Sequence, residues 1–302
     1  RPTAMIYSDR RVGLLYLMPF LLGLLVFLLF PFVASLLLSF SDYRMQDPIS
    51  AARFAGLDNY ATMAADPTFR TSFWVTIVYV LVTVPLKLAF ALFIAFVLNF
   101  RMRAIGAFRT AYYLPSILGG SVAIAVVWRY VFANDGLINQ ALALAGADAV
   151  NWLGEPGYAM ATIVLLRLWQ FGSAMVIFLA GLQAIPDDLY EAARLDGASR
   201  WRMFRSITLP LLTPVIFFNL IMQMVQAFQE FNGPYVITGG GPLKSTYLLP
   251  LMIYEEGFKY FDVGYASALS WVLFAIIAVL TAIAFRSSKY WVFYGSERGG
   301  GK

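Results

Sequence analysis

The chain has 302 residues, a formal net charge of +5 and a mean hydropathy of +0.71. Hydrophobic residues make up 60% and charged residues only 13%, whereas a soluble protein is typically about 25% charged, so the composition argues against a water-soluble fold. The sequence contains no Cys and no His, which removes disulfides, thiol nucleophiles, histidine bases and nearly every zinc site.

Six apolar runs are each long enough to cross a membrane, which takes about 20 residues of helix. The first run is overlong and carries Pro19 and Pro31, which predicts a tilted or kinked span or an interfacial start. This run is too long for the apolar part of a signal peptide. Because the chain starts at Arg1, the sequence leaves open whether the natural protein has further residues before it. We expect an all-α integral membrane protein whose residues 1–302 form a single transmembrane domain. The expected spans are residues 12–40, 72–99, 107–133, 158–184, 204–232 and 263–285.

Basic residues collect on one side of these spans. Of the 22 Lys and Arg residues, fourteen fall on one side, five on the other and three (Lys87, Arg129 and Arg167) within spans. The positive-inside rule makes the richer side cytoplasmic, so both termini and residues 186–203 are expected in the cytoplasm. Membrane topology thus explains the excess of basic over acidic residues, and no nucleic-acid partner is expected. The fourteen are Arg1, Arg10, Arg11, Arg101, Arg103, Arg109, Arg194, Arg200, Arg202, Arg205, Arg286, Lys289, Arg298 and Lys302; the five are Arg44, Arg53, Arg70, Lys244 and Lys259.

The stretch "DDLYEAARLDGASR" (187–200) interrupts the apolar sequence with six charges. Pro186 ends the fourth span, and Asp188 with Glu191 three residues later predicts a capping box. Gly197 suits a left-handed residue at the helix end. A helix of about nine residues is too short to persist alone, which predicts a partner that holds it. A solvated loop helix is the alternative.

The longer stretch "EAARLDGASRWRMFRSITLPLLTP" (191–214) resembles the EAA loop of binding-protein-dependent ABC importer permeases. In that family the short helix couples the permease to the ATPase subunit. The resemblance continues in "FAGLDNY" (54–60), "FRTAYYLPSILGGSVAIAVVWRYVF" (108–132), "NWLGEP" (151–156) and "ITGGGP" (237–242), which are similar to the carbohydrate branch of maltose and glycerol-3-phosphate importer permeases. The end near "YWVFYGSE", without a basic-glycine tail, resembles the first of the two permease types, and the chain as a whole resembles alginate importer permeases.

This resemblance implies a type I ABC importer permease fold in the bacterial cytoplasmic (inner) membrane, surrounded by lipid. It implies a second permease subunit as heterodimeric partner, two copies of a cytoplasmic ATPase subunit, a periplasmic solute-binding protein and a carbohydrate substrate. The chain itself would carry no catalytic residue, metal or cofactor, because ATP and Mg are bound by the ATPase. The coupling positions carried over are Glu191, Ala192, Ala193, Asp196, Gly197 and Ala198.

The fifth span carries four polar residues spaced four, three and four positions apart, which predicts a stripe along one helix face. Such a stripe is costly in hydrocarbon and usually faces a bundle interior or an aqueous path. Nearby aromatic rings would suit the apolar C–H faces of a sugar. Interhelical hydrogen bonding is the alternative. The expected pathway residues are Asn219, Gln223, Gln226 and Glu230 with Phe228, Phe231 and Tyr235.

Lys87 and Arg167 lie too deep in their spans to reach the membrane surface comfortably, unlike Arg129. One interpretation is a buried pair or a carbonyl contact that fixes packing. The other is attraction of an anionic substrate, such as a uronic-acid oligomer like alginate or a sugar phosphate. Both alternatives stay open at this point.

The run "GGGPLKST" (239–246) superficially resembles a phosphate-binding loop, but Leu243 replaces the required glycine, no strand precedes it and it is extracytoplasmic. We interpret Gly239, Gly240, Gly241 and Pro242 as a turn that contacts the solute-binding protein. Two other functions are alternatives to a permease. An ion-coupled secondary transporter usually has repeat halves and broken midplane helices, and neither is evident. A membrane-embedded hydrolase would need a Ser/Lys or Asp/Asp arrangement that the sequence does not identify.

Overall fold

The structure, a computed structural model, describes residues 10–100 and 105–293, with only the backbone of residues 10–12. In these ranges the chain is helical, and β-pairing is confined to isolated bridges at Ser41–Phe54 and Arg44–Asp262. The chain divides into two compact units. The smaller comprises residues up to Ala65 with Ile253–Val272, and the larger comprises Asp66–Met252 with the residues from Leu273 onward.

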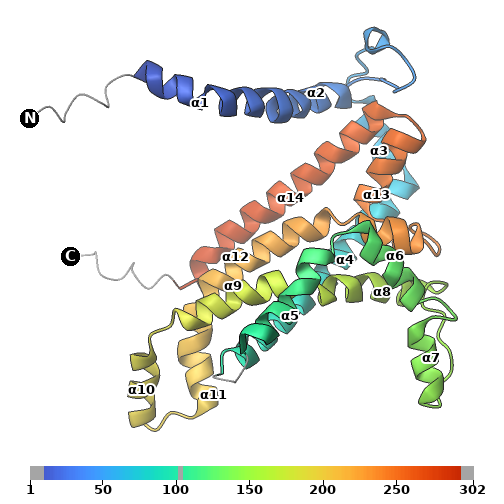
Figure 1. Cartoon of the computed structure of the whole chain (residues 1–302). Coiled ribbons are helices and arrows are strands. Elements are labelled where there is room, and N and C mark those ends of the chain that lie inside the picture. The colour runs from blue at the N-terminus through green and yellow to red at the C-terminus, as the bar shows by residue number, and fades with distance from the viewer. Residues whose placement is uncertain (1–9, 101–104, 294–302) are drawn as a thin grey trace, which may run out of the picture. The chain divides into compact units, whose positions relative to one another are not determined.

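In the smaller unit one long apolar helix is followed by a short, hydrogen-bonded cap region. Asn59 fastens this region, because its Nδ2 donates to the carbonyls of Ser39 at 2.9 Å and Ser41 at 2.8 Å. Trp271 Nε1 donates to Ser35 Oγ at 3.2 Å. The helices are α1 (Arg10–Leu24), a π-helical turn (Leu25–Leu29), α2 (Phe30–Ser39), a 3-10 turn (Ile49–Ala51) and α3 (Asp58–Ala65); a π-helical turn (Glu255–Lys259) and the start of α14 (Val263–Trp291) complete the unit (Figure 1).

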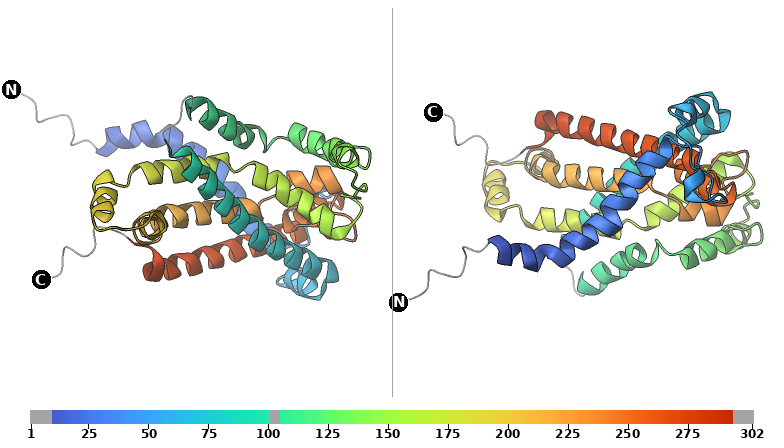
Figure 2. Two further views of the ribbon diagram at one scale, coloured as in Figure 1. Left: turned by 90° about the horizontal axis from the view of Figure 1, so that it is seen from below. Right: turned by 90° about the horizontal axis from the view of Figure 1, so that it is seen from above.

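The larger unit is built around α4 (Pro67–Leu98), which packs against α8, α9 and α12. Figure 2 shows α4 crossing obliquely while α9 and α12 run side by side. The other elements are α5 (Ile105–Leu118), α6 (Val122–Val131), α7 (Leu137–Leu144), α8 (Pro156–Trp169), α9 (Gly172–Gln183), α10 (Asp187–Leu195), α11 (Arg200–Met203), α12 (Leu209–Phe228), α13 (Leu249–Tyr254) and π-helical turns at Phe204–Thr208 and Pro234–Thr238.

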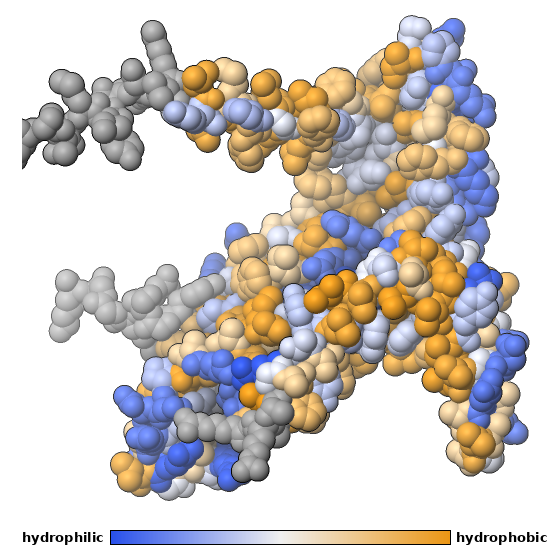
Figure 3. Space-filling model, viewed as in Figure 1, coloured by the Kyte–Doolittle hydropathy of each residue, from blue (hydrophilic) through white to orange (hydrophobic). Residues whose placement is uncertain are grey.

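Within the described residues, four helices are long and apolar enough to cross a membrane: Gly13–Ser39, Pro67–Leu98, Arg200–Phe228 and Val263–Trp291. They correspond to the first, second, fifth and sixth expected spans. The total reaches six if each of two bent helix pairs is one span. In Figure 3 the surface of Gly13–Ser39 is mostly hydrophobic, whereas α10 and α11 carry many hydrophilic side chains.

The third and fourth apolar runs are not the unbroken helices that the sequence predicted. The pair α5–α6 is bent by 101° and the pair α8–α9 by 45°. In the first pair, Ser121 begins a new helix by accepting a hydrogen bond from the Ile124 amide at 3.4 Å. In the second, the α-helical hydrogen bonding of α8 ends before Gln170. Hydropathy does not register either break, because the residues on both sides are apolar.

The charged stretch forms α10, a helix of nine residues, which confirms the predicted length. The expected capping box is wrong: Pro186 occupies the cap position without a side-chain hydrogen bond, and Asp188 lies in the first turn. Acidic residues there still favour the positive end of the helix dipole. The left-handed glycine is confirmed, with φ +74° at Gly197. Amide donation from Ala198 to the Ala193 carbonyl at 2.9 Å completes a Schellman motif.

The α8–α9 break depends on close backbone packing at Gly172. A Cβ at this position would collide with the carbonyl oxygen of Tyr112 and would lie 2.8 Å from the Cα of Tyr113. We therefore expect Gly172→Ala to lower the unfolding free energy by about 1–3 kcal/mol, as overpacking does. The thermal unfolding midpoint of the purified transport complex measures this. Gly157→Ala, where a Cβ meets nothing within 4 Å, is the matched control and should leave the midpoint unchanged or slightly higher. Equal midpoints for both variants would contradict the packing argument.

Candidate functional site

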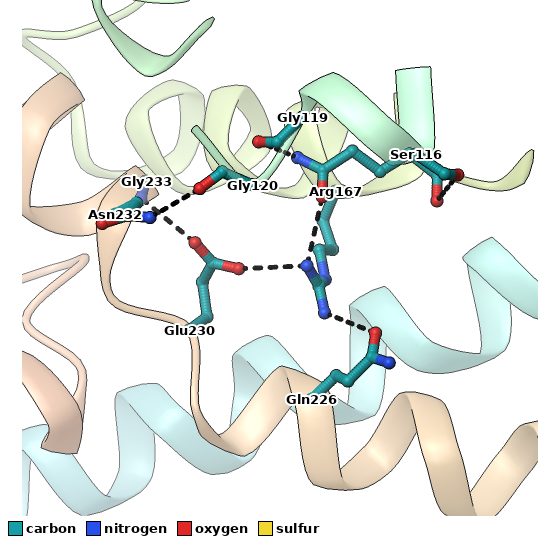
Figure 4. A network of polar contacts seen from close by, with 9 residues as sticks. Ser116, Gly119, Gly120, Arg167, Gln226, Glu230, Asn232 and Gly233 are labelled. Atoms are coloured by element: carbon teal, nitrogen blue, oxygen red, sulfur yellow. Dashed lines mark hydrogen bonds and ion pairs between the residues drawn. The ribbon is translucent and has the colours of Figure 1, made fainter. Parts of the chain in front are cut away.

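Polar groups meet where the two bent helix pairs approach the end of α12 (Figure 4). We call this the helix-break site and define it by Gly119, Gly120, Arg167, Gln170, Gln226 and Glu230. These residues line a cavity of about 390 Å³. Irregular backbone at membrane depth is tolerated only where it is buried in protein or lines a cavity. The site meets the second condition, because Gly119, Gly120 and Gln170 at the breaks line this cavity.

Gln170 satisfies backbone groups that the breaks set free. Its Nε2 donates to the carbonyl of Gly119 at 2.8 Å, and its own carbonyl accepts from Ser116 Oγ at 3.0 Å. Asn232 Nδ2 donates to the carbonyl of Gly120 at 2.8 Å. Side chains therefore replace the helical hydrogen bonds that both bends interrupt. Gly119 is required here, because a Cβ at this position would collide with the side chain of Gln170.

Arg167 is the centre of the charged part of the site. Its Nη1 lies 3.5 Å from Glu230 Oε2 and donates to Gln170 Oε1 at 3.1 Å, while its Nη2 donates to Gln226 Oε1 at 3.0 Å. Glu230 Oε1 also accepts from the Gly233 amide at 3.1 Å. The side chains of Arg167 and Glu230 are only 14% and 12% exposed. The structure thus pairs Arg167 with a carboxylate of this chain.

Lys87 lies deeper, with 2% of its surface exposed. It makes no hydrogen bond or ion pair within the described part of the chain, although the charges of Arg167 and Glu230 both act on it. Tyr79 and Thr83 precede it at four-residue intervals on α4, and their buried hydroxyls interact with each other and have no other partner in the described chain. Sequence analysis missed these two residues. Polar side chains at four-residue intervals before Lys87 share its helix face, and this spacing would have indicated both residues in the sequence.

On α12, Asn219 and Gln223 are buried, as a stripe facing the bundle interior predicts. Neither Asn219 Oδ1 nor Gln223 Oε1 has a hydrogen-bond partner in the described ranges. Gln226 is exposed and belongs to the helix-break site. Because α12 ends at Phe228, Glu230 lies beyond the helix and the expected four-residue stripe is three residues long on the helix itself. We call the buried polar groups of these two packed helices the polar seam: Tyr79, Thr83 and Lys87 of α4 with Asn219 and Gln223 of α12.

The expected aromatic residues separate into two sets. The rings of Phe231 and Tyr235 stack with centroids 5.0 Å apart, and Tyr235 is exposed. Phe228 is 1% exposed and packs in the interior instead. Residues 239–242 form a turn, with φ +59° at Gly239 and +83° at Gly240. Thr246 Oγ1 donates to the carbonyl of Gly241 at 2.8 Å, which holds the turn closed.

The six coupling positions gather on α10 and its exit. None of the described residues of α10 is buried. Glu191, Asp196 and Gly197 are exposed, and Ala193 and Ala198 are half-buried. Beyond its chain connections, α10 is held by a hydrogen bond of 2.9 Å between Tyr190 Oη and Thr208 Oγ1 at the base of α12.

Comparison with known proteins identifies the class to which this site belongs. Residues 61–292 match the family described as "Binding-protein-dependent transport system inner membrane component". The chain therefore belongs to this family of membrane transport components, and it is a multi-pass inner-membrane protein.

Individual relatives cover nearly the whole chain. "Probable ABC transporter permease protein YesP" of Bacillus subtilis is 47% identical over 97% of this chain and 95% of its own length. The "Sulfoquinovosyl glycerol transport system permease protein SmoG" of Agrobacterium fabrum is 36% identical, with 92% and 91% covered. The "Trehalose/maltose transport system permease protein MalF" of Thermococcus litoralis is 35% identical, with 94% and 96% covered.

Solved structures show the same fold. A bacterial ABC transporter involved in the import of the acidic polysaccharide alginate contains a chain that matches with a TM-score of 0.79 and 23% identity. That match covers 92% of this chain and 96% of the other. A second structure, of a bacterial alginate ABC transporter in complex with alginate pentasaccharide-bound periplasmic protein, matches with a TM-score of 0.78. These likenesses establish a type I ABC importer permease fold.

The ion pair of the helix-break site leads to a test by double-mutant cycle. Glu230→Gln keeps a hydrogen-bond acceptor for Gly233 but leaves the charge of Arg167 uncompensated. Removing one partner of a buried pair costs about 3–5 kcal/mol, so the thermal unfolding midpoint of the complex should fall. Arg167→Gln combined with Glu230→Gln should recover much of the loss. Additive losses in the double variant would show that the pair does not interact energetically.

Proposed function

We propose that this chain is a permease subunit that imports carbohydrate through the helix-break site and the polar seam. The observation that carries the proposal is the set of buried polar groups of the polar seam, in which Asn219 Oδ1 and Gln223 Oε1 have no partner in the described chain. Unpaired buried polar groups are costly, and a hydroxyl-rich ligand supplies donors and acceptors in equal measure. The named substrates of two relatives, trehalose/maltose and sulfoquinovosyl glycerol, are sugars or sugar derivatives and support this class.

The proposed assembly contains a second permease subunit, two copies of a cytoplasmic ATPase subunit and a periplasmic solute-binding protein. The family description itself names a binding-protein-dependent system. The alginate transporter, solved with its periplasmic protein, supports the same arrangement. ATP and Mg would bind to the ATPase, and this chain would contribute no catalytic residue or cofactor. Both termini and α10 would face the cytoplasm, while the turn at 239–242 would face the solute-binding protein.

Coupling would act through α10. A helix with no buried described residue needs an external surface to hold it, and the EAA positions Glu191, Asp196 and Gly197 are exposed for that contact. ATPase closure would displace α10 and, through Tyr190 and Thr208, the base of α12. Alternating access then requires two arrangements of the larger unit whose populations the ATPase shifts.

The charges favour an acidic carbohydrate as the substrate class. Arg167 is neutralised by Glu230, whereas the buried Lys87 has no ion pair in the described chain. An anion beside a buried lysine favours the charged form of that lysine. We therefore assign recognition of a carboxylate or phosphate on the sugar to Lys87 and a positioning role to Arg167.

This charge assignment is tested by competition. Lys87→Gln should reduce uptake of an acidic oligosaccharide such as an alginate oligomer by about tenfold or more relative to a neutral oligosaccharide of equal length, since a charge-assisted hydrogen bond contributes about 1.5–3 kcal/mol. Uptake into vesicles containing the complete transporter measures both. Preference of the wild-type transporter for the neutral sugar would reject the acidic substrate while leaving the carbohydrate proposal standing.

The pathway itself is tested on α12. Gln223→Leu and Gln226→Leu remove amide groups and should lower both uptake and substrate-stimulated ATP hydrolysis by about fivefold or more for each lost hydrogen bond of ~1 kcal/mol. Met222→Leu changes an exposed neighbour on the same helix and should leave both rates unchanged. Wild-type rates in both glutamine variants would remove α12 from the pathway.

The coupling role of the EAA loop is tested by substitutions within it, and a second glycine that ends a helix in a Schellman motif provides the control. Gly197→Asp places a side chain at φ +74° on the EAA loop, and Glu191→Lys reverses a charge there. Each should abolish most of the ATPase stimulation by substrate-loaded binding protein while membrane insertion stays intact. Gly146→Asp is the matched control, because Gly146 has φ +77° and ends α7 with the same pair of amide contacts. Normal stimulation in both loop variants would count against the coupling role.

The energy source separates this proposal from its two alternatives. Broken helices, which the structure contains, are also found in ion-coupled transporters. In this chain, however, Glu230 is ion-paired with Arg167, and the family is that of binding-protein-dependent systems. Transport that stops without the ATPase subunit but survives a protonophore while ATP lasts supports the ATP-driven importer. An acid–base hydrolase would instead release cleaved product without any ATP.

A further inference from the structure

A large cavity lies at the end of the larger unit that carries α10. It has a volume of about 1420 Å³ and is lined by the last turns of α4, the start of α5, the end of α9, and residues of α10 and α11 with the π-helical turn Phe204–Thr208. We call it the foot cavity. None of the six coupling positions lines it, so it is separate from the surface proposed to meet the ATPase.

The side of the foot cavity formed by α4 is apolar and aromatic. Leu92, Phe93 and Phe96 line it within the span, and Phe93 is 61% exposed. Four rings form a continuous series: the centroids of Phe96 and Phe100 lie 5.5 Å apart, those of Phe96 and Phe204 5.7 Å, and those of Trp201 and Phe204 5.6 Å. Exposed aromatic rings at the end of a span are typical of the membrane–water interface.

The foot cavity is also lined by basic residues. Among the described residues these are Arg109, Arg194 and Arg200, and the lining contains one carboxylate, Asp187. Arg109 Nε is buried without a hydrogen-bond partner in the described chain, and its Nη2 reaches the carbonyl of Leu98 only at 3.5 Å. The lining therefore has an excess of two positive charges and an unused guanidinium donor.

We propose that the foot cavity binds the headgroup of an anionic phospholipid, whose acyl chains lie along Phe93 and Leu92 of α4. The ligand must match both the aromatic and the basic lining of the cavity. A free inorganic anion would pair with the arginines but leave the aromatic rings uncovered, whereas a phospholipid supplies both a phosphate and an apolar chain. Basic pockets between transmembrane helices on the cytoplasmic side are sites of this kind. Guanidinium groups bind phosphate oxygens with paired hydrogen bonds.

The position of this site gives the lipid a mechanical role. Trp201 and Phe204 belong to the segment between α10 and α12, and Phe96 and Phe100 belong to the end of α4. A lipid held between them would brace the coupling segment against α4. Loss of the lipid should therefore weaken the response of the ATPase to substrate without altering substrate recognition at the polar seam.

The experiment uses the complete transporter with its partner subunits, exchanged into phosphatidylcholine nanodiscs with and without phosphatidylglycerol. Native mass spectrometry measures how much of each lipid stays bound after release from the disc. The wild-type complex should retain phosphatidylglycerol in preference to phosphatidylcholine. Arg109→Gln with Arg200→Gln should reduce that retention about twenty-fivefold, since each basic residue near an anionic lipid changes binding about fivefold. Arg53→Gln with Arg70→Gln removes two exposed arginines elsewhere and is the matched control.

Three results would overturn the proposal. These are equal retention of the two lipids by the wild-type complex, undiminished retention in the Arg109/Arg200 variant, and an equal loss in the control variant. Loss of the ATPase subunit from the Arg109/Arg200 variant with lipid retention intact would instead make the foot cavity a protein interface. If that variant does not assemble, the lipid preference of the wild-type complex still tests the proposal. Because lipid retention is measured without substrate, failure here is distinguishable from failure of the carbohydrate proposal.

Discussion

The hydrogen bonding of Gln170 is the contact on which the larger unit depends. In hydrocarbon every backbone donor and acceptor needs a partner within the protein, and a bend in a spanning helix removes such partners. Each bend is compensated by a side chain from the other: the Gln170 amide binds the carbonyl of Gly119 at the α5–α6 break, and Ser116 Oγ binds the carbonyl of Gln170 at the α8–α9 break. Two interrupted helices thereby become one connected junction, and Arg167 is oriented from that junction toward Glu230.

The two polar regions of the larger unit differ in how fully they are satisfied. At the helix-break site the guanidinium of Arg167 has three polar partners, so a ligand entering there must replace existing interactions. In the polar seam, by contrast, Asn219 Oδ1 and Gln223 Oε1 have no partner in the described chain. Under the proposed function, a ligand would donate hydrogen bonds to these two oxygens without displacing a described partner. The first region would then control passage and the second would bind the ligand.

The amino-acid sequence predicted the helices better than the contacts between them. Hydropathy located all six apolar runs, and the local chemistry of Gly197 was sufficient to predict the end of α10. The breaks at residues 119–121 and 170–171 were not predicted, because they are stabilised by Gln170 and Ser116, which come from different runs and are far apart in sequence. Arg167 was identified as a deep charge, but its partner Glu230 was assigned to the pathway, since periodicity places residues on one helix and does not pair two helices.

The ring contact between Phe96 and Phe204 has a consequence for how the subunit moves. Phe204 begins the short π-helical turn that ends at Thr208, and Thr208 is also where Tyr190 ties α10 to the base of α12. One five-residue segment thus touches the lower ends of both helices that line the polar seam. A displacement of α10 would be transmitted to both α4 and α12, so the ends of these helices next to Phe204–Thr208 should move together. The polar seam would then widen at the opposite ends of the two helices, with Phe204–Thr208 as the hinge.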